Sequence, residues 1–388
     1  MKKDGDRLSC LLITPGFYPA VKYGGPVTSL VNFVHALSRD IDVHVLTLNN
    51  DFKSGEQLVD CPGQWMDFGN ARVMYLPGKD FSHRTVWELY SSVEADFIYL
   101  NGYYSASVSM PTIIACRRHS IPLLMAFRGE LLPGAVSQKR LKKLLFICMT
   151  RHLFKREWVF QATSEAEVQA ICHRIGCARD RVALLENFPA LYDGYKRGKS
   201  KTPGSLSLIY MARIHPGKNL FVALKALSKV RGSIAFNIYG PVEDESYWRD
   251  CSELMRQMPQ EIRIEYRGIC HGSCIESAYE HSQAMILPTR TENYGQTIVE
   301  SMLCGCPVVI SDRTPWNEIN DYRSGWAIPL TEEESFTAAL QALVDMDQSE
   351  YDELLEHNRQ FVESHFEEQM LKDRYMQVFD RLRWGMNA

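Results

Sequence analysis

The sequence predicts an α/β protein built from two domains, each with a parallel β-sheet. The first observation is that short apolar runs alternate with segments of helical periodicity, and that this series occurs twice along the 388 residues. The second is a polar segment at residues 190–205, containing Gly, Pro, Lys and Ser, which separates the two series and is expected to be a linker. Apolar runs without polar alternation are typical of parallel strands that helices cover on both faces. A hydrophobic content of 45% is sufficient for two such cores.

The first series precedes the linker. Its predicted strands are 8–14, 42–48, 71–77, 95–102, 121–129 and 158–164, and the helical segments between them include 26–39, 105–119 and 138–157. We therefore expect an N-terminal Rossmann-like domain at residues 1–192.

The second series follows the linker. Its predicted strands are 206–212, 234–240, 262–268, 284–288, 307–312 and 325–329, and its predicted helices are 218–230, 245–258, 274–281 and 296–304. We expect a second domain at residues 203–364, and a final helix at about 365–388 that crosses back to the first domain. Two such domains imply a cleft between them. Because ligands of parallel sheets bind beyond the carboxyl ends of the strands, the residues that follow each strand are the candidates for a site.

Composition excludes several classes of protein. No apolar run reaches the length of a membrane-spanning helix, and the apolar stretch 11–14 is too short for a signal-peptide core, so we expect a cytoplasmic protein. The 11 cysteines include three near pairs, Cys172/Cys177, Cys270/Cys274 and Cys304/Cys306. None has a second pair at zinc spacing, so we expect neither a metal site nor a disulfide.

Two glycines follow the first predicted strand. Gly24 and Gly25 precede Pro26 and a helix, and such a pair lets the backbone approach a phosphate at the positive end of the helix. The alternative is an ordinary tight turn. The dinucleotide fingerprint G-x-G-x-x-G is not present at this point, which disfavours a nicotinamide cofactor.

Two cations follow the first strand of the second domain. Arg213 and Lys218 flank a Pro-Gly turn, which can direct both side chains at one point. Two cations over a diphosphate would offset the charge that develops on a leaving nucleotide. The alternative is a solvated turn.

Two glutamates surround a predicted helix start in the stretch TENYGQTIVESMLCGCPVV, residues 291–309. Glu292 lies in the loop, Gly295 frees the backbone before the helix, and Glu300 shares a helix face with Gln296 at i and i+4. Carboxylates in a pocket can accept hydrogen bonds from adjacent hydroxyl groups, which ribose and hexose rings both carry. The alternative is that both carboxylates are solvated.

In combination, these residues resemble a known family. Arg213-x4-Lys218 with Glu292-x7-Glu300 is similar to the retaining glycosyltransferases of the GT-B fold, sequence family 4. The glycine pair, "IYGP" at 238–241 and "EN" at 186–187 agree with this. The resemblance implies two Rossmann-like domains that face each other across a cleft, and transfer of a hexose from a UDP- or GDP-linked donor to a glycan hydroxyl with retention of configuration. It implies no metal and no cofactor.

The resemblance also implies roles for residues. Arg213 and Lys218 would bind the donor diphosphate, Glu300 the ribose hydroxyls and Glu292 the transferred sugar. The other donor-binding candidates are Gly24, Gly25, Tyr239, Gly240, Arg267, Gly268, Ile269, Asn293, Tyr294, Gly295 and Gln296.

The chain departs from the family in its first domain, where many relatives carry a histidine that contacts the donor sugar. Asn101, Arg128 and Glu130 occupy the corresponding strand ends, while His119 and His152 lie in helical segments where we expect surface positions. Arg128 is a catalytic candidate that could polarise the donor or hold an anionic acceptor. Glu130 could orient the acceptor hydroxyl or pair with Arg128. Asn101 and Tyr103 complete the candidates on the acceptor side.

A basic stretch lies at residues 137–158. Residues 113–160 hold 10 Lys and Arg against 2 Asp and Glu, although the whole chain has a net charge of −4. A basic helix with apolar residues can lie on an anionic membrane surface, or can be an ordinary domain helix whose apolar face is core. Nucleic acid is disfavoured because the overall charge is negative and no binding motif is present.

We expect the acceptor to be a glycan, lipid-linked, in the biosynthesis of capsule, O-antigen or exopolysaccharide at the inner face of the cytoplasmic membrane. Two alternatives remain open. One is a sugar-nucleotide epimerase or hydrolase on the same fold, and the other is a non-catalytic protein that binds sugar nucleotides.

Overall fold

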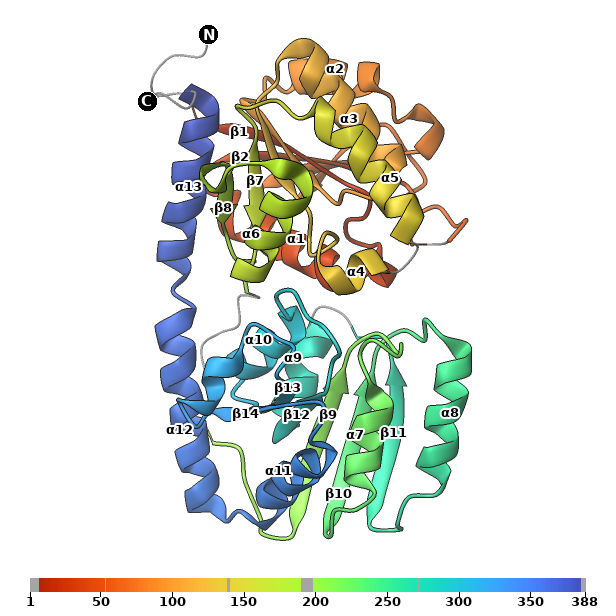
Figure 1. The fold of residues 1–388 in the computed structure, drawn as a ribbon, viewed down its shortest axis with the longest axis vertical. Coiled ribbons are helices and arrows are strands. Elements are labelled where there is room, and N and C mark those ends of the chain that lie inside the picture. The colour runs from red at the N-terminus through yellow and green to blue at the C-terminus, as the bar shows by residue number, and fades with distance from the viewer. Residues whose placement is uncertain (1–6, 53, 138–139, 190–197, 271–272, 385–388) are drawn as a thin grey trace. The chain divides into compact units, whose positions relative to one another are not determined.

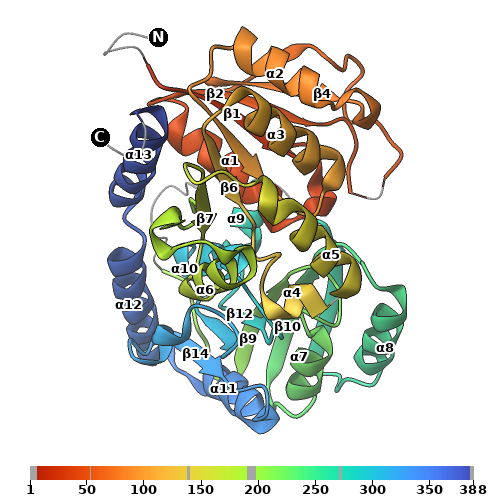
Figure 2. The same ribbon diagram turned by 45° about the horizontal axis from the view of Figure 1, so that its top comes forward.

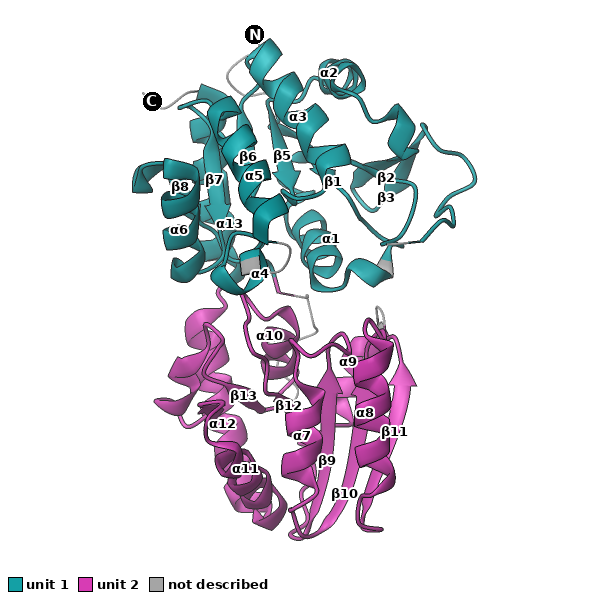
Figure 3. Cartoon of the chain, turned by 45° about the vertical axis from the view of Figure 1, so that its right-hand side comes forward, with its two compact units in different colours: residues 1–188, 368–388 teal, residues 189–367 magenta. Residues whose placement is uncertain are grey.

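The computed structural model describes residues 7–52, 54–137, 140–189, 198–270 and 273–384 (Figures 1 and 2). The N-terminal tail, Lys139 of the basic stretch and most of the expected linker, residues 190–197, lie outside this part of the chain. The chain forms two compact units, one of residues 1–188 with 368–388 and the other of residues 189–367 (Figure 3).

Unit 1 contains an eight-stranded sheet in the order β3-β4-β2-β1-β5-β6-β7-β8. Its strands are β1 (Ser9–Thr14), β2 (Asp42–Leu48), β3 (Trp65–Phe68), β4 (Ala71–Leu76), β5 (Phe97–Asn101), β6 (Leu123–Ala126), β7 (Val159–Ala162) and β8 (Val182–Leu184). Neighbouring strands are parallel except β3 and β4, which form an antiparallel edge that the sequence analysis did not predict.

The α-helices of unit 1 are α1 (Gly25–Leu37), α2 (His83–Ser92), α3 (Ala106–His119), α4 (Pro133–Ser137), α5 (Arg140–Thr150), α6 (Glu165–Ile171) and α13 (Glu368–Trp384). Successive residues of β1 serve opposite faces of the sheet, as the pleat of a strand requires. Leu11 and Ile13 pack in the core under α2, α3 and α5, whereas Cys10 and Leu12 pack in the core under α1 and α13.

Helix α13 is part of the first core although it is the last element of the chain. Phe379 packs against Phe97 of β5 with ring centroids 4.8 Å apart, and Tyr375 lies 5.6 Å from Phe33 of α1. The hydroxyl of Tyr375 donates to the carbonyl of Glu186 at 2.9 Å and accepts from Nε2 of Gln161 at 2.8 Å. Figure 2 shows α13 beside α1.

Unit 2 contains a six-stranded parallel sheet in the order β11-β10-β9-β12-β13-β14. Its strands are β9 (Ser205–Met211), β10 (Ser233–Tyr239), β11 (Ile262–Gly268), β12 (Ala284–Leu287), β13 (Val308–Ser311) and β14 (Gly325–Ile328). Its α-helices are α7 (Leu220–Leu227), α8 (Glu245–Arg256), α9 (Ser273–Glu280), α10 (Gln296–Leu303), α11 (Glu333–Asp345) and α12 (Gln348–His365).

Each sheet has a point where the strand order reverses direction. In unit 1 this point lies between β1 and β5, and in unit 2 it lies between β9 and β12. The loops that follow these strands therefore diverge to opposite faces and leave room for a ligand. No helix in the described part of the chain combines the length and the apolarity needed to cross a membrane.

Candidate active site

In unit 2 the loops after β9 and β12 are joined by backbone contacts. The carbonyl of Gly217 accepts from the N–H of Arg290 at 2.9 Å and from Oγ1 of Thr289 at 3.1 Å. The loop with Arg213 and Lys218 is therefore held against the loop that leads to α10. The two groups of residues that the sequence analysis singled out in unit 2 meet at the reversal of strand order.

Lys218 and Glu292 form an ion pair between these two loops. Both side chains are largely buried, with 18% and 15% of their surface exposed. Arg213 forms an ion pair with Glu243, in which the two side chains are 43% and 24% exposed. Both cations were predicted from the sequence, but Glu243 was not among the predicted residues. Its position just after the strand end at Tyr239 is the signal that could have drawn attention to it.

Two glycines shape these loops. Gly240 has φ 135°, and a Cβ at this position would lie 1.9 Å from the carbonyl oxygen of Ala212, directly before Arg213. Gly295 has φ 79°, and its Cβ would lie 2.9 Å from Ile298 and 3.1 Å from Cγ of Glu292. The prediction that Gly295 frees the backbone before α10 is confirmed.

Glu300 is 2% exposed within α10, and its Oε1 has no hydrogen-bond partner among the described residues. Burial raises the pKa of this carboxyl group to about 8, while a hydrogen bond with Gln296 acts in the opposite direction. The alternative of a solvated Glu300 is therefore wrong. A buried carboxyl oxygen without a partner is costly unless a ligand completes it.

Tyr294 packs edge-on against Trp316, at 5.4 Å between ring centroids, and is 4% exposed. Its side chain therefore belongs to the core of unit 2. Asn293 lies partly buried in the same loop, next to Glu292.

The ends of β10 and β11 carry the residues that were predicted to line the nucleobase. The N–H of Gly240 donates to the carbonyl of Gly268 at 2.8 Å, which joins the two strand ends. Ile269 is 40% exposed and Tyr239 is half-buried. Arg267 is paired with Glu265 at 2.6 Å.

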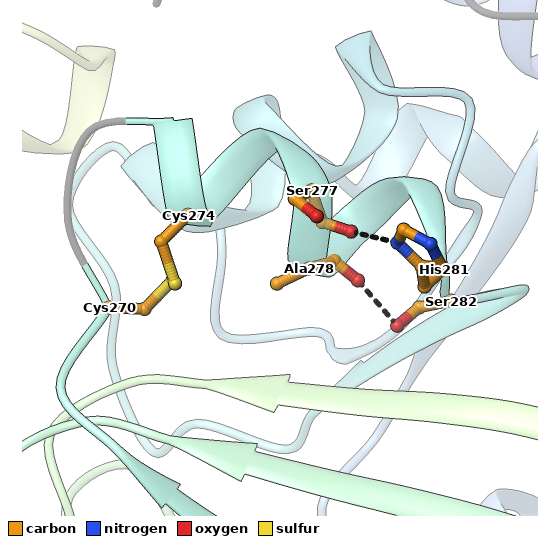
Figure 4. Close-up of a disulfide and its surroundings, with 6 residues drawn as sticks. All are labelled: Cys270, Cys274, Ser277, Ala278, His281 and Ser282. Carbon is orange, nitrogen blue, oxygen red and sulfur yellow. Dashed lines mark hydrogen bonds between the residues drawn. A yellow bond between two sulfur atoms is a disulfide. The ribbon is translucent and has the colours of Figure 1, made fainter.

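A disulfide joins Cys270 and Cys274 beside these residues, so the expectation that the chain has no disulfide is wrong. Figure 4 shows Cys270 after the end of β11 and Cys274 in the first turn of α9. Their Cα atoms are 5.6 Å apart, within the range that a disulfide spans. The expectation rested on cysteines that are scattered and on a reducing compartment, and neither argument shows that Cys274, at the start of α9, lies beside Cys270 at the strand end.

In unit 1 a cavity of about 320 Å³ lies at the reversal of strand order between β1 and β5. It is lined by residues of the loops after β1, β2, β5 and β6 and of α1, namely Thr14, Pro15, Gly16, Tyr23, Pro26, Val27, Leu30, Phe52, Asn101, Gly102, Tyr104, Ser105, Arg128 and Glu130. Three of the predicted residues, Asn101, Arg128 and Glu130, therefore share one cavity.

Arg128 is held by three neutral acceptors. It donates from Nε to Oδ1 of Asn101 at 2.8 Å, from Nη1 to Oδ1 of Asn187, and from Nη2 to the hydroxyl of Tyr99 at 3.3 Å. The ion pair between Arg128 and Glu130, which the sequence left open, is not formed among the described residues. The backbone of Arg128 is left-handed, with φ 54°.

Two glutamates hold the turn that carries Arg128. Glu130 accepts through Oε2 from the backbone N–H groups of Tyr103 and Tyr104, at 2.6 and 3.0 Å. Glu167 is fully buried and accepts from the N–H of Gly129 and, at 2.8 Å, from that of Thr163. Sequence analysis missed Glu167. Desolvation raises the pKa of Glu130 above its ordinary value, and the two backbone hydrogen bonds oppose this.

Tyr103 does not lie where the sequence analysis placed it. Its side chain is fully buried, bonded through its hydroxyl to Thr150 and packed 5.1 Å from the ring of Phe127. The next residue, Tyr104, lines the cavity instead. The sequence pattern located the strand end but not which of the two adjacent tyrosines faces the cavity. Neighbouring side chains at a strand end point in different directions. His119 and His152 are exposed, as expected.

Gly24 and Gly25 begin α1. Gly24 has φ 68° and caps the helix without a side-chain hydrogen bond, and the following residues, Pro26 and Val27, line the cavity. In the part of the chain that the structure describes, no group of three or more His, Cys, Asp or Glu side chains is arranged to hold a metal ion.

Known families match both units. The family described as "Glycosyltransferase Family 4" matches residues 23–188, and "Glycosyl transferases group 1" matches residues 205–346. The chain belongs to glycosyltransferase family 4.

Two relatives of this family-4 chain come from Escherichia coli. "Putative colanic acid biosynthesis glycosyltransferase WcaL" of strain K12 is 23% identical over 210 residues, which are 51% of this chain and 50% of the relative. "O-antigen chain mannosyltransferase B" is 21% identical over 180 residues, 43% of each chain. The chain therefore spans about half the length, or less, of the curated relatives it matches.

Solved structures share the fold. Anabaena Alr3699/HepE in complex with UDP and glucose has a TM-score of 0.73 at 14% identity, and the match covers 96% of this family-4 chain and 100% of that chain. WaaG, a glycosyltransferase involved in lipopolysaccharide biosynthesis, has a TM-score of 0.69 at 13% identity, with 97% and 100% covered. The predicted GT-B fold is confirmed.

Proposed function

We propose that the chain is a retaining glycosyltransferase that moves a hexose from a UDP- or GDP-linked donor to a hydroxyl group of a glycan in surface polysaccharide biosynthesis. The observation that carries this proposal is the arrangement of Lys218, Glu292 and Glu300 at the strand-order reversal of unit 2, within the matched residues 205–346. The names of the two Escherichia coli relatives support the setting, and the UDP and glucose bound to HepE support a nucleotide-sugar donor.

Arg213 and Lys218 are the groups that would bind the donor diphosphate. Each is held by one carboxylate, Glu243 and Glu292 respectively, which fixes its position before a ligand arrives. A diphosphate competes with these carboxylates for the cations, and the cations then offset the charge that builds on the leaving nucleotide. We propose that they do so without a metal ion.

Glu300 and Glu292 would bind the two sugars of the donor. Oε1 of Glu300, which has no partner among the described residues, accepts hydrogen bonds from the ribose hydroxyls. Glu300 loses its proton when the ribose binds, because these hydrogen bonds stabilise the carboxylate form. Glu292, once Lys218 turns to the phosphate, accepts from hydroxyls of the transferred hexose. A leaving phosphate oxygen takes the proton of the acceptor hydroxyl as the new glycosidic bond forms on the face from which the nucleotide departs.

A lipid-linked acceptor fits one surface of unit 1. Leu141, Leu145 and Met149 follow one another at intervals of four residues along α5 and are 85%, 63% and 61% exposed. Exposed basic residues of the same stretch are Arg140, Lys142, Arg151 and Arg156. Of the two readings of the basic stretch, we therefore propose contact with the surface of an anionic membrane at its inner face.

The test is thermal unfolding of the purified protein with a panel of UDP-, GDP- and ADP-sugars. A ligand that binds only the folded state raises the unfolding midpoint. We expect one nucleotide series to stabilise the wild type but neither Glu300→Ala nor Lys218→Ala. Turnover with glycan acceptors then separates a transferase from an epimerase or hydrolase, which need no acceptor, and from a non-catalytic binder. No shift with any nucleotide sugar at millimolar concentration would overturn the donor assignment.

A further inference from the structure

The cavity of unit 1 contains an arginine that forms no ion pair with a carboxylate of the described residues. Arg128 is the only lysine, arginine or histidine among the residues that line it, and all three of its hydrogen bonds go to neutral acceptors. A guanidinium group carries more N–H donors than these three bonds use. A partly buried positive charge that meets only neutral acceptors is less favourable than one paired with an anion, so this site suits an anionic ligand.

A second, independent observation is the side chain of Asn101. It is 2% exposed and lines the same cavity, and its Nδ2 has no hydrogen-bond partner among the described residues. The orientation of this amide is determined by its neighbour, because Oδ1 must face the Nε of Arg128 from which it accepts. Although the side chain of Asn101 also influences the hydroxyl of Tyr99, its Nδ2 makes no hydrogen bond of normal geometry among the described residues and lies beside the guanidinium group of Arg128.

The backbone adds to the positive potential of the cavity. Helix α1 begins at Gly25 without a side-chain cap, and its first-turn residues Pro26 and Val27 line the cavity. The positive end of a helix dipole favours an anion. The carboxyl group of Glu130, the only acidic group in the lining, is engaged by two backbone N–H groups and is not directed to Arg128.

The backbone of Arg128 is strained, which separates this arginine from a solvated surface residue. A left-handed φ of 54° is uncommon for a residue other than glycine, and such strain is found where surrounding contacts impose it. The buried Glu167 supplies these contacts by accepting from the N–H of Gly129. The turn is thus built to present the guanidinium group to the cavity.

We propose that this cavity binds an acidic sugar residue of the acceptor, whose carboxylate accepts hydrogen bonds from Arg128 and Asn101. The inference rests on the proposed function, since it assigns the chemical class of the acceptor. Tyr23, Phe52 and Tyr104 also line the cavity, and aromatic side chains are suitable for contact with a sugar ring. The acceptor glycan therefore contains a uronic acid or another carboxylate-bearing sugar at or next to the hydroxyl that is glycosylated.

The test compares two probes that differ only at C6, methyl β-glucuronide with a carboxylate and methyl β-glucoside with a hydroxymethyl group, by ligand-observed NMR titration of the full chain. We expect the wild type to bind the glucuronide at least about tenfold more tightly, the size expected of a charge-assisted hydrogen bond. Arg128→Gln and the isosteric Asn101→Asp, which places a carboxylate beside Arg128, should both lose this preference. Arg72→Gln, at a 62% exposed arginine of the same unit, is the matched control and should keep it.

The outcomes separate this inference from the donor assignment. Saturating UDP or GDP, whichever nucleotide the chain binds, should leave the glucuronide bound, whereas displacement by that nucleotide would mean that Arg128 serves the donor phosphate and would overturn the inference. Equal binding of the two glycosides by the wild type, or a preference that survives in both variants, would also overturn it. A wild type that binds UDP but shows no preference refutes only the acidic acceptor, and one that prefers the glucuronide but binds no nucleotide refutes only the donor site.

Discussion

Glu292 holds Lys218 in an ion pair that links the loop after β12 to the loop after β9, with about one sixth of either side chain exposed. In the proposed function, the carboxylate of Glu292 accepts hydrogen bonds from hydroxyl groups of the hexose. The ammonium group of Lys218 binds the diphosphate. The two proposed roles are therefore coupled, since the lysine cannot serve both partners fully at once.

Glu292→Gln should separate nucleotide binding from sugar transfer. Without the carboxylate, Lys218 is free for the diphosphate, so we expect UDP or GDP to bind as tightly as to the wild type or a few-fold more tightly. Transfer should fall by about 10²–10³, the usual cost of removing one group that stabilises a transition state. Isothermal titration with the nucleotide and a transfer assay measure the two effects.

The controls for this prediction lie in the same unit. Lys218→Met should weaken nucleotide binding, while Lys225→Met, which removes an exposed ion pair with Glu333, should change neither quantity. Equal loss of nucleotide affinity in Glu292→Gln and Lys218→Met would contradict the coupling.

Glu300→Gln should make stability less dependent on pH. The folded-state pKa of Glu300 is raised to about 8, so the protonated form is the one that suits the folded chain. The contribution of Glu300 to the free energy of unfolding is complete below the pKa of this group in the unfolded chain, near 4.5. It is lost as the pH rises through the folded-state pKa of about 8. The free energy of unfolding of the variant minus that of the wild type should therefore increase between pH 5 and pH 8. The expected increase is on the order of 2–4 kcal/mol.

Urea unfolding of both proteins at the two pH values checks this. Glu253→Gln, at a 60% exposed glutamate, should show no such difference. A Glu300→Gln variant that gains nothing at pH 8 would show that the carboxyl group is not desolvated as described.

Gly240→Ala and Gly268→Ala should differ sharply although both glycines have positive φ. A Cβ at residue 240 meets the backbone carbonyl of Ala212 at 1.9 Å, which cannot move without displacing the start of the Arg213 loop. A Cβ at residue 268 would meet no atom of the described residues within 4 Å, so only the left-handed backbone opposes alanine, at about 1–2 kcal/mol. Thermal unfolding should show a modest shift for Gly268→Ala and a far larger one, with loss of nucleotide binding, for Gly240→Ala.

Helix α5 should bind anionic vesicles. In sedimentation with phosphatidylglycerol-containing vesicles, Leu141→Glu and Leu145→Glu should each weaken binding about tenfold, because each replaces an exposed leucine that would insert into the lipid interface. Met370→Glu, at a 53% exposed methionine on α13, is the control and should bind like the wild type. If the wild type ignores the vesicles, or if the α5 variants bind unchanged, the membrane assignment is wrong.

The features that were predicted correctly are those that depend only on residues close together in the sequence. Buried parallel strands appear as apolar runs, and all twelve runs contain strands of the structure. Gly295 and the pair of Gln296 and Glu300 follow from backbone freedom and from helical spacing. Strands β3 and β8 were missed, because β3 lies at an antiparallel edge and is partly exposed, and β8 has only three residues.

The contacts that were not predicted depend on chain segments far apart in the sequence. Glu243 pairs with Arg213 across 30 residues, and the bond from Gly129 to Glu167 spans 38. The burial of Tyr103 depends on Thr150 and Phe127, which no spacing rule connects to it. Cys270 and Cys274 are close in sequence, but their pairing depends on the position of the first turn of α9 beside the end of β11.

The position of α13 has a consequence for how the chain folds during synthesis. Phe33 and Phe97 are translated early. Their packing partners, Tyr375 for Phe33 and Phe379 for Phe97, are translated only after all of unit 2. Unit 2 is thus an insertion within unit 1, and it can fold first although it is made second, which reverses the usual order in multidomain proteins. An exchange of unit 2 between relatives, by recombination or in the laboratory, accordingly needs two junctions, one after residue 188 and one before residue 368.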